Sequence, residues 1–542
     1  MRDVVVVGAG HNALVAACYL AAEGLDVEVV ERRDVVGGAV STVDRFDGYR
    51  MDVGSSAHIM VRHTGIIEDL DLADCGLAYV DLDPWGFAPV AESPDADGPA
   101  TQAIAFHLDL DATCDSIAAV CGDADATAYH AFATDWGERN ARIFELFCEA
   151  PTLGNVGRRM AGVGRATGLD GLELSRQFLT SGDALLDEHF GDERLKTALA
   201  WLGAQSGPPT HEPATADLVG WNMVMHRLAP GRAIGGSGSL STALAERLRR
   251  LGGTVRLGDG AARIVARDGR VRGVVTESGE RIAADVVVAG CHVLTTLGLV
   301  GDEALPHGFA DRARRTIRTG NGIGMVVRLG TTALPSYPGS LGGAEHHALQ
   351  LLAPSRRFLR EAHGDFVAGR PPSRPAALAM AFSAIDPSIA PEGRHNVTVW
   401  GQWHPYRLST GESWDAIRER EGQKLIDAVD AAAPGFARTV EHAYVQTPLD
   451  LERELGLVDG QVMHVDMSLD QMFAWRPMPE LSGYRMPVDG LYLTGASTHP
   501  GGGVFGASGR TAARVVVRDR ARAARPWRRA ASAVRRRVGG RT

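Results

Sequence analysis

The chain opens with a glycine turn between two short apolar runs, and this feature constrains its fold more than any other. The order is strand, glycine turn, helix, strand and acid, at residues 4–7, 8–10, 14–23, 27–30 and 31. A βαβ unit that binds a dinucleotide requires this order. The sequence therefore predicts a Rossmann-like domain at the beginning of the chain.

Residue sizes in this turn agree with that prediction. Gly8 permits the tight turn, and Gly10, which lacks a Cβ, lets the backbone approach a pyrophosphate. Ala13 is small enough for the helix to pack on the sheet. The helix N-terminus, near His11 and Asn12, offers N–H groups and a positive dipole end to phosphates.

Glu31 lies about twenty residues after the turn, where a carboxylate accepts hydrogen bonds from ribose hydroxyls. A carboxylate at this position would also repel a 2′-phosphate. We expect the dinucleotide to contact Gly8, Gly10, His11, Asn12, Ala13 and Glu31.

A second glycine pair follows the second strand and again allows a ligand to approach the backbone. The stretch through this pair resembles the amine oxidase and phytoene desaturase group of flavoproteins. In that group the acid, an arginine two residues on and the Gly-Gly pair contact FAD. The resemblance implies a non-covalent FAD, held in part by Glu31, Arg32, Arg33, Gly37 and Gly38.

The carboxyl-terminal part of the chain supplies a matching motif. GASTHPGGGVFGA at residues 495–507 lies between an expected strand, 491–493, and an expected helix, 508–517. It resembles the carboxyl-terminal motif of bacterial phytoene desaturases, whereas classical amine oxidases have Gly-Glu at its start. The resemblance places this turn on the pyrophosphate and flavin, through Gly495, Ala496, Gly503, Val504 and Phe505.

Other segments extend the resemblance. It implies that Gly54, Ser55 and Ser56 pass beside the flavin ring and that Ala261 meets adenine through its backbone. Residues 386–393 and 460–477 resemble the phytoene desaturase group specifically. A second, NAD-binding fingerprint at 236–238 is the weaker interpretation, because no apolar strand precedes it and no acid ends the next strand. We expect a helix-capping turn there. Without a nicotinamide site, electrons would leave FAD to oxygen, a quinone or another carrier.

The length of 542 residues is too great for one core. We expect an α/β fold with a Rossmann-like FAD-binding domain and an interleaved substrate-binding domain, made of a mixed sheet and a helical cap. The expected ranges are 1–90, 231–300 and 486–517 for the FAD-binding domain, 91–230 for the cap, 301–485 for the substrate-binding domain and 518–542 for a basic tail.

Composition excludes several classes of protein. The net charge of −10 argues against a nucleic-acid partner. The six cysteines include no CxxC, which argues against a redox disulfide and is typical of a reducing cytoplasm. No apolar run is long enough to span a membrane, and no metal-ligand spacing stands out. No targeting segment is expected, because residue 4 already lies in a predicted strand.

Members of the resembled group desaturate, isomerise or oxidise lipophilic substrates, and a flavin takes hydride from a carbon. The candidate proton-handling groups are His58, His464, Asp466 and His499. Each also has a structural interpretation, such as pairing of Asp466 with Arg476. The amine oxidase alternative is weakened because the strand at 322–329, expected to supply a lysine, has Arg328 and no lysine.

The sequence thus predicts an FAD-dependent oxidoreductase that abstracts hydride from a lipophilic or secondary-metabolite substrate. An amine or amino-acid oxidase and a non-catalytic flavin-binding structural or assembly protein remain as alternatives. The tail from Arg518 to Thr542 holds ten arginines and Trp527. It is interpreted either as a basic amphipathic helix in peripheral contact with anionic lipid or as a solvated extension.

Overall fold

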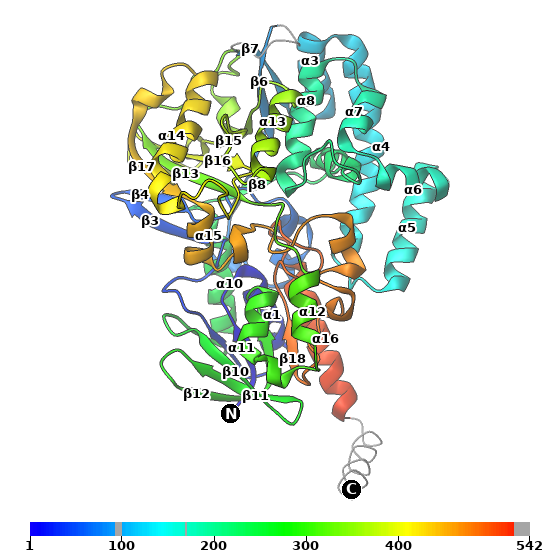
Figure 1. The fold of residues 1–542 in the computed structure, drawn as a ribbon, viewed down its shortest axis with the longest axis vertical. Coiled ribbons are helices and arrows are strands. Elements are labelled where there is room, and N and C mark those ends of the chain that lie inside the picture. Colours follow the sequence, from blue (N-terminus) through cyan, green and yellow to red (C-terminus); the bar gives the residue numbers. More distant parts are fainter. Residues whose placement is uncertain (93–99, 169–170, 525–542) are drawn as a thin grey trace, which may run out of the picture.

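The computed structural model describes residues 1–92, 100–168 and 171–524. The fold is α/β, and two sheets form the two ends of an elongated molecule (Figure 1). The chain crosses between these ends several times, so each sheet is assembled from distant parts of the sequence. This architecture confirms the predicted fold class.

The first sheet has the strand order β10-β11-β12-β1-β2-β9, and β18 also pairs with β12. Its strands are β1 (Arg2–Val7), β2 (Val27–Val30), β9 (Thr254–Arg256), β10 (Ala261–Arg267), β11 (Arg270–Thr276), β12 (Arg281–Ala289) and β18 (Leu491–Leu493). β1 is parallel to β2 and β12, and β9 and β18 extend the parallel part. The Rossmann-like arrangement predicted from the glycine turn is therefore present.

The second sheet has the order β17-β13-β16-β15-β14-β6-β7 and is antiparallel except between β14 and β6. Its strands are β6 (Gly86–Ala91), β7 (Ala100–Phe106), β13 (Gly324–Thr331), β14 (Leu349–Leu352), β15 (Ala377–Met380), β16 (His395–Gln402) and β17 (Val440–Gln446). Two small ribbons pair β3 (Thr42–Phe46) with β4 (Tyr49–Asp52) and β5 (Tyr79–Asp81) with β8 (Gly231–Ala233). The mixed sheet predicted for the substrate-binding domain is present, and β13 confirms the strand predicted at 322–329.

Helices cover both sheets and build the cap. The cap helices are α3 (Leu110–Cys121), α4 (Asp123–Phe147), α5 (Leu153–Thr167), α6 (Gly171–Leu179), α7 (Gly182–His189), α8 (Glu193–Gly203) and α9 (Ala216–Gly220). The others are α1 (His11–Ala22), α2 (Ile66–Asp69), α10 (Gly238–Arg250), α11 (Val293–Val300), α12 (Phe309–Thr316), α13 (Arg356–Val367), α14 (Trp414–Ala432), α15 (Pro448–Leu455) and α16 (Ala507–Ala524). The helical cap of the predicted fold class is therefore present.

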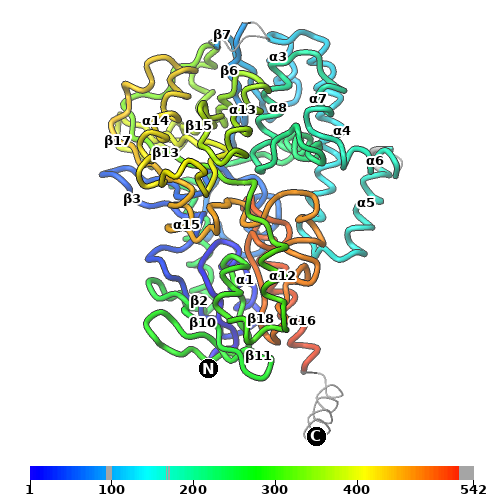
Figure 2. The backbone as a smooth tube through the Cα atoms, in the orientation of Figure 1, coloured from blue at the N-terminus to red at the C-terminus, as the bar shows by residue number. Residues whose placement is uncertain are grey.

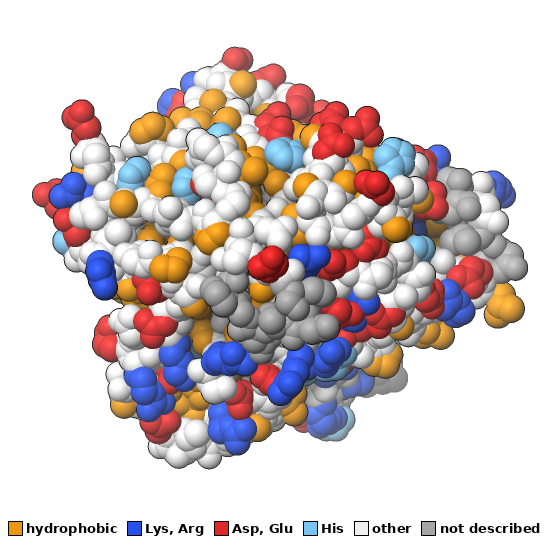
Figure 3. All heavy atoms as spheres, turned by 90° about the horizontal axis from the view of Figure 1, so that it is seen from above, with side chains coloured by type: hydrophobic (Ala, Val, Ile, Leu, Met, Phe, Trp, Pro, Cys, Tyr) orange, Lys and Arg blue, Asp and Glu red, His pale blue; other side chains and the backbone are white. Residues whose placement is uncertain are grey.

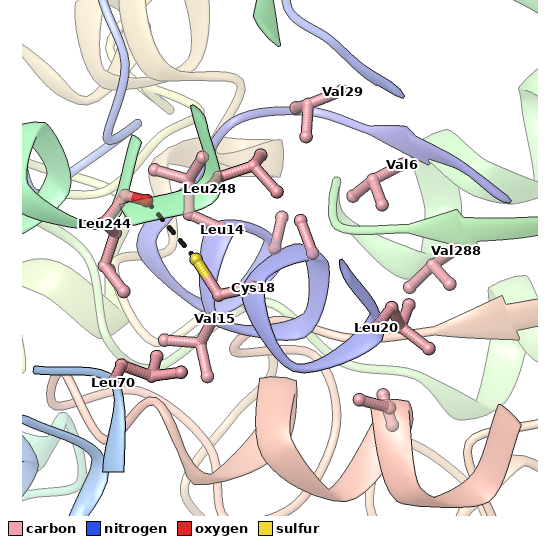
Figure 4. Packing of buried hydrophobic residues seen from close by; sticks show 14 of the residues in the cluster. Val6, Leu14, Val15, Cys18, Leu20, Val29, Leu70, Leu244, Leu248 and Val288 are labelled. Atoms are coloured by element: carbon pink, nitrogen blue, oxygen red, sulfur yellow. Dashed lines mark hydrogen bonds between the residues drawn. The ribbon is translucent and has the colours of Figure 1, made fainter. Parts of the chain in front are cut away.

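From Ala13 onward, helix α1 packs on the first sheet among buried apolar side chains (Figure 4). Val6 faces this core, which α10 and α16 also cover, and Val5 faces the opposite core under α11 and α12. The Sγ of Cys18 donates a hydrogen bond to the carbonyl of Leu244 at 3.3 Å. Because both faces are covered, β1 consists of consecutive valines instead of alternating apolar and polar residues.

Some predicted domain boundaries fall inside structural units. The boundary at residues 90 and 91 divides β6, which pairs in the second sheet. Helix α12, assigned to the substrate-binding domain, packs Phe309 against the core of the first sheet, and Val465 joins the same core. Apolar periodicity identifies the buried face of an element but not the sheet that receives it, which explains these differences. The remaining boundaries stay predictions.

Helix α16 continues past residue 517, so the first part of the predicted tail belongs to the folded body. Asp519 pairs with Arg485 at 2.7 Å, and Arg520 pairs with Asp3 at 2.8 Å. Residues 525–542 lie outside the described residues.

The amino terminus and α16 lie at the same end of the molecule, opposite the second sheet and the cap (Figure 2). Seen from the cap end, acidic and basic side chains gather on different parts of the visible face (Figure 3). Within the described ranges, no helix combines the length and apolar character needed to cross a bilayer.

Candidate functional site

The carboxyl ends of four parallel strands meet at a cavity of about 500 Å³. Gly8, Glu31, Gly290 and Gly495 follow β1, β2, β12 and β18 and line it. Ligands of open parallel sheets bind at this edge. The predicted cofactor residues that line the cavity are Gly8, Gly10, His11, Asn12, Ala13, Glu31, Arg32, Arg33, Gly37, Gly38, Ala261, Gly495 and Ala496.

The two amino-terminal glycine turns lie against each other. The N–H of Gly37 donates to the carbonyl of Ala9 at 2.7 Å, and Gly10 and Gly37 form a bridge. Gly37 has a φ of 110°, and a Cβ there would lie 2.1 Å from the carbonyl oxygen of Val40. A Cβ on Gly10 would meet no atom within 4 Å. Gly37 is therefore required for the fold, whereas Gly10 leaves open space beside the backbone.

Helix α1 begins at this open space. Its N-cap residue, Gly10, provides no side-chain cap, so the N–H groups of the first turn remain available to a ligand. Asn12 is buried, and its Oδ1 has no hydrogen-bond partner among the described residues. Its Nδ2 lies 3.0 Å from Nε2 of His11, whose pKa is lowered to about 4 by desolvation. Free N–H groups and an unpartnered amide oxygen fit the phosphates and hydroxyls of a dinucleotide.

Glu31 joins the first glycine turn to the end of β2. Its Oε2 accepts from the N–H of Ala9 at 2.7 Å and its Oε1 from the N–H of Arg33 at 2.9 Å. The guanidinium of Arg33 donates to the carbonyl of Gly38 at 3.1 Å, and burial lowers its pKa. Each carboxylate oxygen has further acceptor capacity for ribose hydroxyls.

Gly54, Ser55 and Ser56 do not line the cavity, but they support its wall. The N–H of Ser55 donates to the carbonyl of Ala39 at 2.8 Å, and a Cβ on Gly54 would lie 2.6 Å from the same oxygen. The Oγ of Ser56 is buried without a hydrogen-bond partner among the described residues. Their predicted contact with the flavin ring stays a prediction.

Arg476 organises the carboxyl-terminal turn. It is fully buried and donates to five main-chain carbonyls, those of Ala496, Met463, Val465, Asp466 and Gln471. Burial lowers its pKa to about 9. The proposed pairing of the Asp466 carboxylate with Arg476 is wrong, because Arg476 contacts only the main chain of that residue.

Asp466 instead accepts at Oδ1 from the N–H of Asn321 at 3.0 Å and from Nε2 of Gln461 at 2.9 Å. Its other oxygen lies 3.9 Å from Nε of Arg318. Desolvation raises the pKa of this carboxyl. These contacts hold the segment that precedes the cavity, and Asp466 itself is not among the lining residues.

His464 is the candidate proton-handling residue that lines the cavity. Its Nδ1 lies 3.2 Å from Oγ of Ser497, and its ring stacks on His292 with centroids 5.3 Å apart. Desolvation lowers the pKa of His464 well below its ordinary value, and that of His292 to about 4. Both rings are therefore neutral near pH 7.

His58 and His499 lie elsewhere. Nδ1 and Nε2 of His58 are 2.7 Å from the hydroxyl of Tyr79 and 2.8 Å from that of Ser237, and desolvation lowers its pKa to about 3. Nε2 of His499 lies 3.1 Å from the carbonyl of Leu146, and burial lowers its pKa to about 4. Their predicted catalytic roles stay untested, and these contacts favour positioning.

A second, smaller cavity of about 140 Å³ lies on the cap side. The predicted cofactor residues Gly503 and Phe505 line it, whereas the carbonyl of Val504 accepts from the N–H of Val61 at 3.0 Å. Met463 lines this second cavity, and its neighbour His464 lines the first. Consecutive residues of the chain thus line the two cavities.

Several lining residues were missed in the sequence analysis. After β12 they are Gly290, Cys291, His292, Thr295 and Leu299, and elsewhere Ala39, Gly260, Ala262, Glu277, Leu455, Gly456 and Leu457. A Cβ on Gly290 would lie 2.5 Å from Cβ of Ala13, which explains why both positions are small. The signal was present, since an apolar strand followed by glycine and a helix repeats the pattern of the first turn.

Comparisons with known proteins agree with this geometry. The sequence profile of the NAD(P)-binding Rossmann-like domain matches residues 6–70. The chain is 33% identical over 551 residues to pyridine nucleotide-disulfide oxidoreductase domain-containing protein 2 of Rattus norvegicus, covering 95% of this chain and 93% of that protein. It is 26% identical to one of the subunits of limonene dehydrogenase of Castellaniella defragrans (95% and 94% covered) and 27% identical to phytoene dehydrogenase of Streptomyces griseus (92% of each covered).

Solved structures share the fold. An oxidoreductase from Methanosarcina mazei superposes with a TM-score of 0.62 at 15% identity, covering 95% of this chain and 100% of that one. Cyclohexylamine oxidase from Brevibacterium oxydans gives 0.57 at 15% identity, covering 96% and 99%.

Fold, cavity and relatives define the class: the protein is a phytoene desaturase-like flavin oxidoreductase. Within that class, the chain belongs to the family of pyridine nucleotide-disulfide oxidoreductase domain-containing protein 2. Despite the name of that family, all six cysteines of this chain are free thiols.

Proposed function

We propose that the protein is an FAD-dependent oxidoreductase that removes hydride from a carbon of a lipophilic substrate. The observation that carries the proposal is that two consecutive residues, Met463 and His464, line an apolar cavity and a glycine-lined cavity respectively. The relatives named for limonene and phytoene support a substrate of this kind.

The residues at the strand ends fit FAD. Open space beside Gly10 would receive the pyrophosphate at the start of α1, and Glu31 would hold the ribose. Gly495 and Ala496 bring the carboxyl-terminal turn to the same cavity. When bound, the flavin would supply the redox chemistry by accepting hydride from a substrate carbon.

The chain's own residues would orient the substrate and exclude water. The apolar cavity carries the side chains of Met60, Ile143, Phe147, Phe178, Leu218, Trp221, Met463, Met467, Leu469, Met472, Phe473 and Phe505. This lining favours a hydrocarbon skeleton over a charged one. His464, neutral near pH 7, would keep the boundary between the cavities uncharged.

A nicotinamide as electron source is disfavoured. A Cβ on Gly236 would lie 2.4 Å from Oγ1 of Thr42, and one on Gly238 would lie 2.5 Å from the main-chain nitrogen of Thr42. These glycines therefore pack closely against Thr42 of the chain itself, which explains why both positions are glycine. Electrons would leave to oxygen, a quinone or another carrier.

Anaerobic mixing with candidate substrates tests the proposal. Loss of the oxidised flavin absorbance on addition of an unsaturated hydrocarbon or a terpenoid is expected. Bleaching by amines, with release of ammonia and hydrogen peroxide in air, would instead identify an amine oxidase. Bound flavin that no substrate class reduces would favour the non-catalytic alternative.

A further inference from the structure

The apolar cavity is lined by the polar side chains of Asn140, Ser206 and Asp217, which the proposed chemistry does not use. Asn140 on α4 and Asp217 on α9 both line it, among methionine and aromatic side chains. A cavity built for a pure hydrocarbon would not need either group. Their presence points to a polar feature on the substrate.

Asn140 is only 1% exposed, and its Nδ2 has no hydrogen-bond partner among the described residues. An amide donor left unsatisfied in the protein interior is costly, and such groups in folded proteins are rare. A ligand atom that accepts a hydrogen bond would satisfy this donor. The amide therefore specifies an acceptor on the substrate.

The carboxylate of Asp217 is held in place by Arg139. Its Oδ1 accepts from Nη2 of Arg139 at 2.6 Å, and Nη1 of Arg139 donates to Oε1 of Gln177 at 2.6 Å. The guanidinium of Arg139 also lies 4.3 Å from the ring centroid of Trp136. This network leaves the second carboxylate oxygen of Asp217 available as an acceptor, because no hydrogen bond to it is found in the described chain.

We propose that Asn140 and Asp217 together recognise a single hydroxyl group on an otherwise apolar substrate. This inference rests on the proposed function, because it assigns the substrate of the same cavity. A hydroxyl accepts one hydrogen bond, from Asn140, and donates one, to Asp217. A hydrocarbon satisfies neither group, and a ketone or an ether satisfies only Asn140.

The same pair disfavours an amine. An ammonium group has no lone pair, so it cannot accept a hydrogen bond from the N–H of Asn140. Its positive charge would also lie close to the guanidinium of Arg139, which already pairs with Asp217. The site therefore separates lipophilic alcohols from amines as well as from hydrocarbons.

The rest of a larger substrate has a place to lie. An outer cavity of about 460 Å³ shares Ala214, Met467 and Leu469 with the inner one. Trp475, which lines the outer cavity, is 48% exposed. The hydroxyl-bearing end would occupy the inner cavity, and an apolar remainder would extend outward past Met467.

Isosteric probes test the inference. Benzyl alcohol and ethylbenzene have nearly the same shape and differ in a hydroxyl against a methyl group, and benzylamine carries the ammonium. Isothermal titration of the holoenzyme is expected to give about tenfold tighter binding of benzyl alcohol than of either other probe, the scale for satisfying a buried donor.

Asn140→Leu should lower the ratio of benzyl alcohol to ethylbenzene affinity several-fold, because it removes the donor at similar size and leaves Asp217 as the remaining partner of the hydroxyl. Met472→Leu, an apolar exchange in the same cavity, should change both affinities together and keep the ratio. Equal affinities in the unmodified protein, a preference that is undiminished in Asn140→Leu, or no binding of any probe would overturn the inference.

Flavin content distinguishes failure of the inference from failure of the proposed function. Titration detects the probes whether or not flavin is present. Protein without flavin that still prefers benzyl alcohol would contradict the FAD assignment alone. Protein with full flavin and no preference would contradict only the hydroxyl site.

Discussion

The main-chain N–H of Ala9 donates to the Glu31 carboxylate at 2.7 Å, so the glycine turn after β1 is fixed to the end of β2. One side chain thereby sets the distance between the places where pyrophosphate and ribose would bind. The acid of the motif is thus part of the cavity's construction as well as a ligand group, since both of its oxygens accept from the main chain.

Glu31→Ala should weaken FAD binding by roughly 1.5–3 kcal/mol, the scale of hydrogen bonds to a charged group. The loss combines the ribose contacts with a looser turn at Ala9. Fluorescence titration of the apoprotein with FAD measures it. Glu28→Ala is the matched control, because Glu28 is a buried acid within β2, just before Glu31, and it pairs with Arg2 and Arg256 instead of lining the cavity. Equal FAD affinity in the Glu31 variant and the unmodified protein would show that this acid does not hold the ribose.

NADH and NADPH should fail to reduce the flavin rapidly. Gly236 and Gly238 pack on Thr42, and Glu31 would repel a 2′-phosphate at the first fingerprint. Stopped-flow absorbance under anaerobic conditions checks this. Reduction at a rate that matches turnover would reinstate a nicotinamide site.

The sequence predicted the parts of the cavity that follow from local geometry. Gly8, Gly10 and Glu31 could be assigned because a strand, a tight turn and a helix N-terminus are short-range features. Gly290 was missed although the same pattern precedes it, since its role depends on contact with Ala13, 277 residues away in the chain. Resemblance alone brought the carboxyl-terminal turn to the same site, and no local rule indicated that Asn140 and Asp217 share a cavity.

Stability should fall in acid through buried neutral histidines, and His58 gives the clearest case. Its folded pKa of about 3 lies below the ordinary 6.5, so the unfolded chain binds protons first as pH falls below 6.5. Stability is therefore present above pH 6.5 and is lost progressively toward pH 3. When the pH falls from 6.5 to 5, the free energy of unfolding should decrease in both proteins. The decrease should be about 2 kcal/mol smaller in His58→Asn than in the unmodified protein, because each pH unit contributes about 1.4 kcal/mol.

Urea unfolding at the two pH values measures this difference. His307→Asn, a change at an exposed histidine, is the matched control. An identical pH dependence in the His58 variant would show that His58 is not held neutral.

Binding to anionic vesicles should depend on residues 525–542 if the tail contacts lipid. Each arginine near such a surface adds on the order of 1 kcal/mol, and screening at 1 M salt, where the Debye length is about 3 Å, should remove the effect. The truncation belongs after Ala524, because Asp519 and Arg520 hold α16 to the body. Sedimentation with vesicles at low and high salt compares the two forms. Failure of both to bind would identify a solvated extension.

Flavin content tests the central claim most directly. Purified protein should be yellow and should release about one FAD per chain on denaturation, identified by mass spectrometry. Gly10→Val should give folded, colourless protein, because its side chain would project into the space beside the turn. Gly154→Val, on α5 at a glycine that also faces open space, should keep the flavin. Unmodified protein that neither contains nor takes up FAD, or full occupancy in the Gly10 variant, would contradict the account.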